Sequence, residues 1–372
     1  MKKSTLIALL SIVCATSFAQ YTTNKVVGEK NQAYLDSIKN AEYPYVLPIL
    51  GKQATRKGFK LQLPAGLSLN YLGQQSDIVI NNLQVGFNNG PKYNLDEIIR
   101  FNSAEATTDG LNFRPDLWLF PFLNVYGIFA RSKTSTSIDA GIWIPDSSDI
   151  WHEVTSFSTK ANFEATTMGF GVTPTMGVGG FFMAFDMNFT WSDIDALEKP
   201  AFAFIFDPRI GKNFTLNDKD MNLAVWAGGF RVKINSNTSG SLPLSDLFST
   251  EDLEAKIDAS QADIEQSQQE VEDWWNGLSS LEQKNPVNEA KYNAANKALA
   301  AAGNFFVAAE GAVNGIHNSS VQYSLDKKQK EMWNFMIGGQ YQYNKHWMVR
   351  GEAGFLGSRT HLIAGLQYRF GL

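Results

Sequence analysis

LIAGLQYRFGL, residues 362–372, ends the chain and sets the fold expected for the rest of it. Its side chains alternate in character, which is typical of a β-strand with two different faces. One face would carry Leu362, Ala364, Leu366, Tyr368, Phe370 and Leu372, and the other His361, Gly365, Gln367 and Arg369. A terminal segment frays unless it is tied down. We therefore expect this strand to be paired and its apolar face to meet apolar surroundings.

The same alternation recurs along most of the chain, in runs of about 9–12 residues, the length a tilted strand needs to cross a bilayer. Short turns and longer loops would join the runs alternately, the long loops falling near 88–110, 132–159, 192–200 and 235–330. The sequence predicts an all-β, antiparallel up-and-down transmembrane β-barrel of ten strands, with eight or twelve left open. The expected strands are 59–87, 110–119, 123–132, 159–171, 177–191, 201–214, 220–234, 331–343, 346–356 and 360–370.

A soluble β-sandwich is the alternative, because its alternating strands turn their apolar faces into a core. The opposite faces here mix glycine, Asn, Thr and charge, whereas a sandwich surface in water is rich in Lys and Glu. Trp and Tyr also gather near the expected strand ends, as in the aromatic girdles of membrane barrels. These features favour the barrel.

Composition and termini bound the cellular setting. Residues 1–19 have a basic start, an apolar core and a small-x-small end, which predicts a secretory signal peptide; a lipoprotein signal at Cys14 is the alternative. Cys14 is the single cysteine, and the net charge of −5 offers no basic footprint for nucleic acid. No metal-ligand spacing or cofactor motif is present. We expect a periplasmic segment at 20–58 and a barrel at 59–372, interrupted by an insert at 245–318.

The chain end also resembles a known signal. Gly365-x-x-Tyr368-x-Phe370 is similar to the C-terminal signature of Gram-negative outer-membrane β-barrel proteins, although Ala364 replaces a polar residue and Gly371-Leu372 extend past the aromatic. The resemblance implies that the barrel assembly machinery recognises Gly365, Tyr368 and Phe370, and that outer-membrane lipid or lipopolysaccharide surrounds the barrel. The Phe-rich, cysteine-free mature chain, with Gln20 at the cleavage point, resembles exported proteins of the Bacteroidetes.

The insert at 245–318 abandons the two-residue period. Ile257, Ile264, Val271 and Leu278 are spaced by seven, which predicts an amphipathic helix. Asn285-Pro286 would start a second, alanine-rich helix with Ala290, Ala294, Ala298 and Ala302 near its packing face. Between Glu251 and Glu310 there are 12 acidic and 4 basic residues. This acidic helical hairpin would be a surface module with an extracellular partner, a lid over the barrel, or a solvated decoration of a loop.

Charged residues opposite the apolar faces would point into the lumen. They would form either a paired network that plugs a narrow barrel or the lining of a polar channel. The expected role is therefore structural or interaction-based at the cell surface, or passive transport of small solutes. A catalytic, lipid-modifying barrel with a site at His361, near Ser358 and Glu352, is the alternative. The candidate lumen residues are Arg114, Asp116, Glu164, Asp186, Asp207, Arg209, Arg231, Lys233, Arg350, Glu352 and Arg369, together with His361.

Overall fold

The computed structural model describes residues 29–372 except 179, 195–196, 198, 217–219, 235–236, 248–252 and 316–317; the expected signal peptide at 1–19 lies outside the described residues. In the described part, ten antiparallel strands form a closed ring, because the last strand pairs with the first. The predicted barrel is confirmed and the sandwich is wrong. The ring runs β1 (Ala65–Phe87), β3 (Ile99–Phe120), β4 (Leu123–Pro145), β5 (Trp151–Val178), β6 (Phe181–Ile194), β7 (Ala201–Thr215), β8 (Asn222–Ile234), β11 (Trp333–Gln342), β12 (Trp347–Phe355) and β13 (Arg359–Phe370).

The outer wall of the barrel is apolar and exposed. On β13 the alternate residues Leu362, Leu366 and Tyr368 are exposed, while His361 and Arg369, on the opposite face, are buried. The same rule holds around the ring, with exposed Leu67, Leu69, Leu111, Phe113, Phe129, Met168, Phe170, Ile210, Phe335, Ile337 and Val349. A band of this kind is stable only against lipid. In the described residues, no helix has the length and apolarity to cross a membrane.

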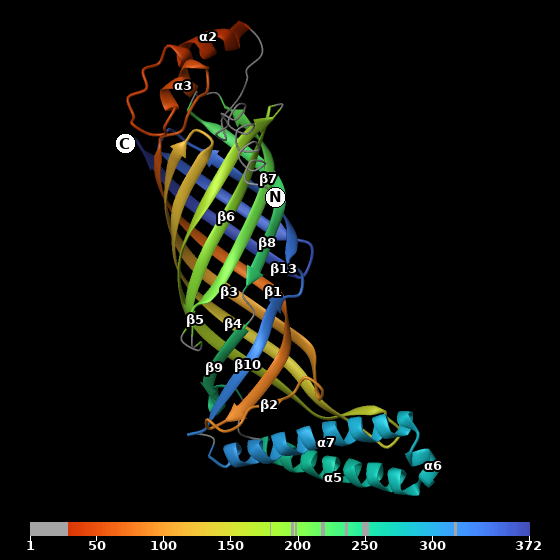
Figure 1. The fold of residues 1–372 in the computed structure, drawn as a ribbon. Helices are drawn as coiled ribbons and strands as arrows, with labels where there is room; N and C mark the ends of the chain where they lie inside the picture. The colour runs from red at the N-terminus through yellow and green to blue at the C-terminus, as the bar shows by residue number, and fades with distance from the viewer. Residues whose placement is uncertain are drawn as a thin grey trace.

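One end of the barrel, called here the turn end, holds the short connections and the C-terminus (Figure 1). Two helices, α2 (Glu29–Lys39) and α3 (Gly51–Arg56), lie there. The amide of Val46 donates to the carbonyl of Leu372 over 3.1 Å, and that of Ile49 donates to the carbonyl of Leu119 over 2.8 Å. The terminal strand is thus held from both sides and from its end. The first strand begins at Ala65 rather than at residue 59 as predicted.

At the opposite end the strands continue beyond the ring, which corrects the sequence interpretation of 88–110 and 132–159 as loops. β3, β4 and β5 run on through these ranges, where β-branched and small residues continue the alternation. β1 pairs with β13 through Ser76 and then, from Ile78, with β10 (Ser320–Gln329). β10 in turn pairs with β9 (Asn237–Pro243), and β2 (Tyr93–Asn94) pairs with β1. We call this part, beyond the ring, the extension.

The insert forms a helical hairpin across the end of the extension (Figure 1). It consists of α5 (Leu253–Gly277), α6 (Ser280–Gln283) and α7 (Pro286–Val313), preceded by α4 (Leu244–Leu247). The expected heptad residues Ile257, Ile264 and Val271 are buried, as are Ala298 and Ala302. Ala290 and Ala294 are exposed, because the hairpin packs along Ala295, Ala298, Leu299, Ala302 and Phe306. These apolar residues join the core of the extension, so the hairpin covers the barrel end instead of standing free.

Candidate functional site

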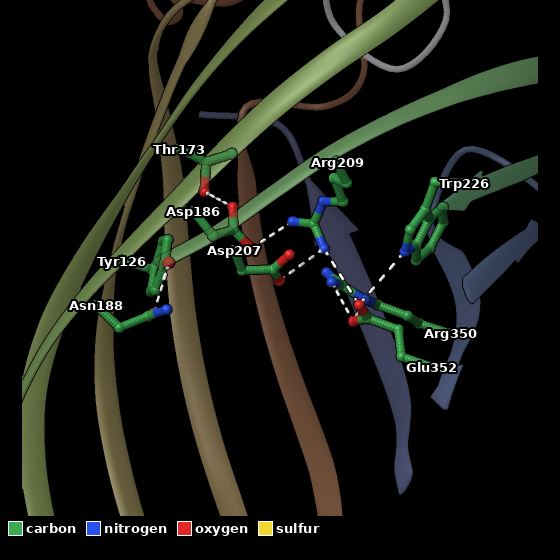
Figure 2. Close-up of polar contacts among 9 residues, drawn as sticks. All are labelled: Tyr126, Thr173, Asp186, Asn188, Asp207, Arg209, Trp226, Arg350 and Glu352. Atoms are coloured by element: carbon green, nitrogen blue, oxygen red, sulfur yellow. Dashed lines mark hydrogen bonds and ion pairs between the residues drawn. The ribbon is translucent and has the colours of Figure 1, made fainter. Parts of the chain in front are cut away.

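The centre of the barrel holds an arginine shared by three carboxylates. Arg209, on β7, forms ion pairs with Asp186 on β6, with Asp207 two residues away at 3.4 Å, and with Glu352 on β12 at 3.5 Å. Its side chain is 1% exposed. The pairs join opposite walls of the lumen, and Figure 2 shows the chain of contacts. Charges buried in this way are tolerated only when they are paired and hydrogen-bonded.

Further groups complete this network. Glu352 also pairs with Arg350, and it accepts from the indole Nε1 of Trp226 over 3.3 Å. The hydroxyl of Thr173 donates to Asp186. Arg350 and Arg209 lie 5.2 and 5.5 Å from the centre of the Trp226 ring, within the range of cation–π attraction. We call this set, contributed by β5, β6, β7, β8 and β12, the Arg209 network.

A second paired group lies closer to the turn end. Asp116 accepts from Arg369 at 3.0 Å, from Asn124 at 2.9 Å and from Gln367 at 2.7 Å. Arg369 also donates to the carbonyl of Leu63 over 2.8 Å, just before the first strand. The chain entering the barrel is therefore fastened to the last strand.

Little space is left between these groups. A cavity of about 60 Å³ lies among residues of both, including Arg114, Asp116, Arg350 and Arg369. Arg114 lies over the ring of Tyr126 at 3.3 Å, and the hydroxyl of Tyr126 donates to Asn188 over 2.7 Å. The two paired groups therefore follow each other along the lumen. The space between them has room for only a few water molecules.

Eight of the eleven candidate lumen residues lie in these two groups or beside them: Arg114, Asp116, Asp186, Asp207, Arg209, Arg350, Glu352 and Arg369. The prediction was wrong for Glu164, Arg231 and Lys233. Glu164 is exposed on the outer face of β5 and pairs there with Arg131 at 2.9 Å and Lys133 at 3.3 Å. Glu164 is an even number of residues from the outward Met168 and Phe170, so it lies on the same face of the strand. The sequence already contained this signal.

On β8 the predicted faces are reversed. Phe230 and Val232 point inward into an apolar cluster with Met336, while Arg231 and Lys233 point outward. Arg231 lies 6.0 Å from the centre of the exposed Trp333 ring. Alternation distinguishes two faces without stating which is inside, and here the interior is the more apolar one. The outward Leu223 and Val225, of the same parity as Arg231, indicated the true orientation.

His361, the centre of the catalytic alternative, is buried against an apolar neighbour. Its ring lies 4.4 Å from that of Phe230, and its Nδ1 is 3.4 Å from the amide nitrogen of Asn334. The hydroxyl of Ser358 accepts from the amide of Glu331 instead, and Glu352 is held in the Arg209 network. In the described chain, no group of three or more His, Cys, Asp or Glu residues is arranged to hold a metal ion.

The sequence interpretation missed three buried groups. Trp226 lies inside the barrel and donates to Glu352. Arg359, 1% exposed, donates to the carbonyls of Phe230 and Met332 over 3.1 Å each. The third is an apolar cavity of about 380 Å³ inside the extension. The cavity could not be found from sequence, because it depends on strands that were expected to be loops.

The terminal signature residues lie on both faces of β13. Tyr368 points outward and contacts Trp347, with ring centres 4.9 Å apart. The ring centre of Phe370 lies 6.4 Å from that of Tyr368. Gly365 points inward, where an added Cβ would lie 2.1 Å from the side-chain oxygen of Asn70. Their recognition by the assembly machinery stays a prediction.

Fold and exterior together define a closed ten-stranded β-barrel of the outer-membrane type, a class found in the outer membrane of Gram-negative bacteria. No family model and no curated protein sequence matches the chain. Among solved structures, it is similar to the β domain of the Bordetella autotransporter BrkA (7% identity, 83% of this chain, 100% of that one, TM-score 0.34). It is also similar to the translocator domain of the autotransporter NalP from Neisseria meningitidis (8% identity, 92% of this chain, 94% of that one, TM-score 0.31). A third similar structure is an outer membrane channel from Pseudomonas putida F1 (8% identity, 84% of this chain, 97% of that one, TM-score 0.28).

Proposed function

We propose that this protein is a sealed outer-membrane barrel that anchors an interaction module at the cell surface. The observation that carries the proposal is the Arg209 network, in which one buried arginine bridges carboxylates on opposite walls. An ion or solute crossing the lumen would have to break these pairs and leave charges unpaired in a dry interior, which costs several kcal/mol. The network therefore supports a plugged lumen rather than an open polar channel.

The lengths of the connections support an assignment of the two membrane sides. In outer-membrane barrels the short turns face the periplasm and the long connections face outward. The turn end, with both helices α2 and α3, would then be periplasmic, and the extension with its hairpin extracellular. The contacts of the extracellular module with its partner would be its function.

The hairpin suits a cationic partner. Residues 251–310 carry 12 acidic against 4 basic side chains, and the acidic side chains of α5 are largely exposed while its apolar ones face the extension. Such a charged surface attracts a partner of the opposite sign and speeds their association. The role proposed is non-enzymatic, because the described contacts hold His361 against Phe230 and Ser358 against Glu331.

Sidedness can be tested with single cysteines, because Cys14 is the sole native cysteine and falls within the predicted signal peptide. A membrane-impermeant maleimide added to intact cells should label Glu265→Cys, on the exposed face of α5. Lys345→Cys, in the turn between β11 and β12, is the matched control and should be labelled only after lysis. Labelling in the reverse order would invert the proposed orientation and refute the surface role.

The plug can be tested by conductance. Purified protein in a planar lipid bilayer should show no stable ion current, whereas Asp186→Ala combined with Arg209→Ala should open a measurable one. A heat-dependent gel shift would establish that the double variant is folded. A steady current from the unaltered protein would contradict the plug and support the passive-transport alternative.

A further inference from the structure

The extension lines a cavity of about 380 Å³, which is within the range of small-molecule sites (about 300–1,000 Å³). Its walls are mainly the inward faces of β1, β3, β4, β5, β9 and β10. Residues of β6, β7 and β8 also line it, as does Phe305 of the hairpin. Protein interiors are normally close-packed, and voids of this size are uncommon. The cavity is therefore a place for a ligand rather than a packing fault of one or two side chains.

The lining is almost entirely aliphatic and aromatic. The lining includes Ile78 and Ile80 of β1, Ile99 of β3, and Phe157 and Phe163 of β5. Apolar walls recognise a hydrocarbon, because burial of each methylene stabilises a complex by about 0.8 kcal/mol. Polar solutes would lose their hydration without compensating hydrogen bonds.

The cavity also has a side on which the sheet is not closed. In the described part of the chain, residues 151–164 of β5 pair with β4 alone, since β6 pairs with β5 only from Ala165 onward. Among the described strands, β9, at the far edge, pairs only with β10. The extension is thus a half-barrel with two unpaired strand edges, those of β5 and β9. Residues of both strands line the cavity.

Among the described residues that line this apolar space, one carries a positive charge. Lys327 of β10 lines the cavity, near the point where β10 replaces β13 as the partner of β1. Its ammonium nitrogen lies 3.5 Å from the hydroxyl of Thr136. Among the described residues, no carboxylate lies within 4 Å of it to form a salt bridge. Burial lowers the pKa of Lys327, because its charge is held in apolar surroundings.

We propose that the cavity binds a fatty acid, with its hydrocarbon chain along the apolar walls and its carboxylate on Lys327 and the hydroxyl of Thr136. Three observations support this ligand: an apolar space of small-molecule size, the cation of Lys327 within it, and a neighbouring hydroxyl donor. A carboxylate would satisfy the ammonium with a charge-assisted hydrogen bond. A neutral or cationic amphiphile would leave it unpaired. The inference is independent of whether the barrel conducts.

The test uses the full-length protein in lipid nanodiscs and a fatty acid that carries a photoreactive diazirine. Illumination should attach the label to peptides from β1, β5 or β10 within the extension. Dodecanoate should compete for labelling at roughly tenfold lower concentration than dodecanol, as expected for one charged hydrogen bond. Competition should be weaker still for dodecylammonium.

Matched variants separate the head group from the chain. Lys327→Met should bring dodecanoate and dodecanol to equal potency, whereas Lys328→Met, the exposed neighbour on the opposite face of β10, should leave the difference intact. Ala161→Trp, which fills the cavity, should abolish labelling while the heat-dependent gel shift remains. Labelling spread over the membrane surface of the barrel, equal potency of acid and alcohol in the unaltered protein, or an unchanged preference in Lys327→Met would each overturn the proposal.

Discussion

The barrel and the extension share one continuous wall but have opposite interiors. Across the membrane the outer face is apolar and the lumen is filled by paired charges, with Arg209 between three carboxylates. In the extension the inward faces become apolar, and Ile78, Ile80 and Ile99 belong to a core shared with the hairpin. The difference follows from the medium outside each part. The apolar outer face of the barrel contacts lipid, whereas the polar outer face of the extension contacts water.

The change in polarity predicts different responses to substitution in the two parts. Paired charges hold the barrel interior, so that it should fail when one partner is removed. Buried apolar surface and hydrogen bonds at helix ends stabilise the extension, so each substitution there should lower its stability by a graded amount. Five substitutions test this comparison.

Removing the shared cation should have the largest effect. Arg209→Ala removes the cation shared by Asp186, Asp207 and Glu352, although Glu352 keeps its ion pair with Arg350. The expected loss of unfolding free energy is about 3–5 kcal/mol. Urea titration of the heat-modifiable form in detergent measures it. Arg131→Ala, which removes a partner of Glu164 on the outer surface, should leave the midpoint unchanged. Equal midpoints for the two variants would remove the distinction between lumen and surface pairs.

A core truncation in the hairpin comes next. Ile264 is 3% exposed, and Ile264→Ala should cost about 2–5 kcal/mol. The hairpin should become sensitive to protease while the barrel keeps its heat-dependent gel shift. Val307→Ala, at a position 65% exposed on α7, is the control and should stay resistant. Loss of the gel shift in Ile264→Ala would show that hairpin and barrel unfold as one unit.

Crowding of the plug should have an intermediate effect. A Cβ at Gly338 would lie 2.4 Å from Nε1 of Trp226 and 2.7 Å from Cγ of Glu352. Gly338→Ala should therefore destabilise the barrel by about 1–3 kcal/mol, measured as a lower urea midpoint. Gly351→Ala, where an added Cβ meets nothing within 4 Å, serves as the control. A Gly338→Ala midpoint as high as that of Gly351→Ala would mean that the network can move aside.

The start of α7 should contribute less. The side chain of Asn285 accepts from the amide of Val287 over 3.0 Å. Asn285→Ala should destabilise the hairpin by about 1 kcal/mol, whereas Asn285→Ser, which can also cap, should retain most of that stability. Protease half-lives of the hairpin measure both. The capping role fails if Ala and Ser variants are cleaved at the same rate.

The smallest effect concerns pH. Hydrogen bonds from the hydroxyl and amide of Ser279 lower the pKa of Glu282. Because the folded-state pKa lies below the unfolded one, this contribution is present above the unfolded value and is lost as pH falls through the folded value. Ser279→Ala should raise the pKa of Glu282 toward its ordinary value in an NMR titration. An unchanged titration would assign the shift to another group.

Much of the barrel was predictable, because a strand between lipid and a polar lumen must alternate residue by residue. The alternation located all ten strands of the ring, and the heptad spacing of Ile257, Ile264 and Val271 located α5. It failed where the interior of the molecule is apolar. On β8 the apolar cluster of Phe230, Val232 and Met336 made the inside resemble a lipid face, and Glu164 stands on the part of β5 whose outer face meets water.

The sequence alone determined that the chain forms an antiparallel barrel with an acidic helical hairpin, because local periodicity states how many faces each segment has. Only the tertiary structure decided which charges meet. Arg209 and Glu352 are 143 residues apart, and their contact depends on how the strands tilt and close. The apolar cavity, bounded by β1, β5, β10 and α7, was likewise decided by tertiary structure, since an enclosed volume is a property of the assembled wall and of no single strand.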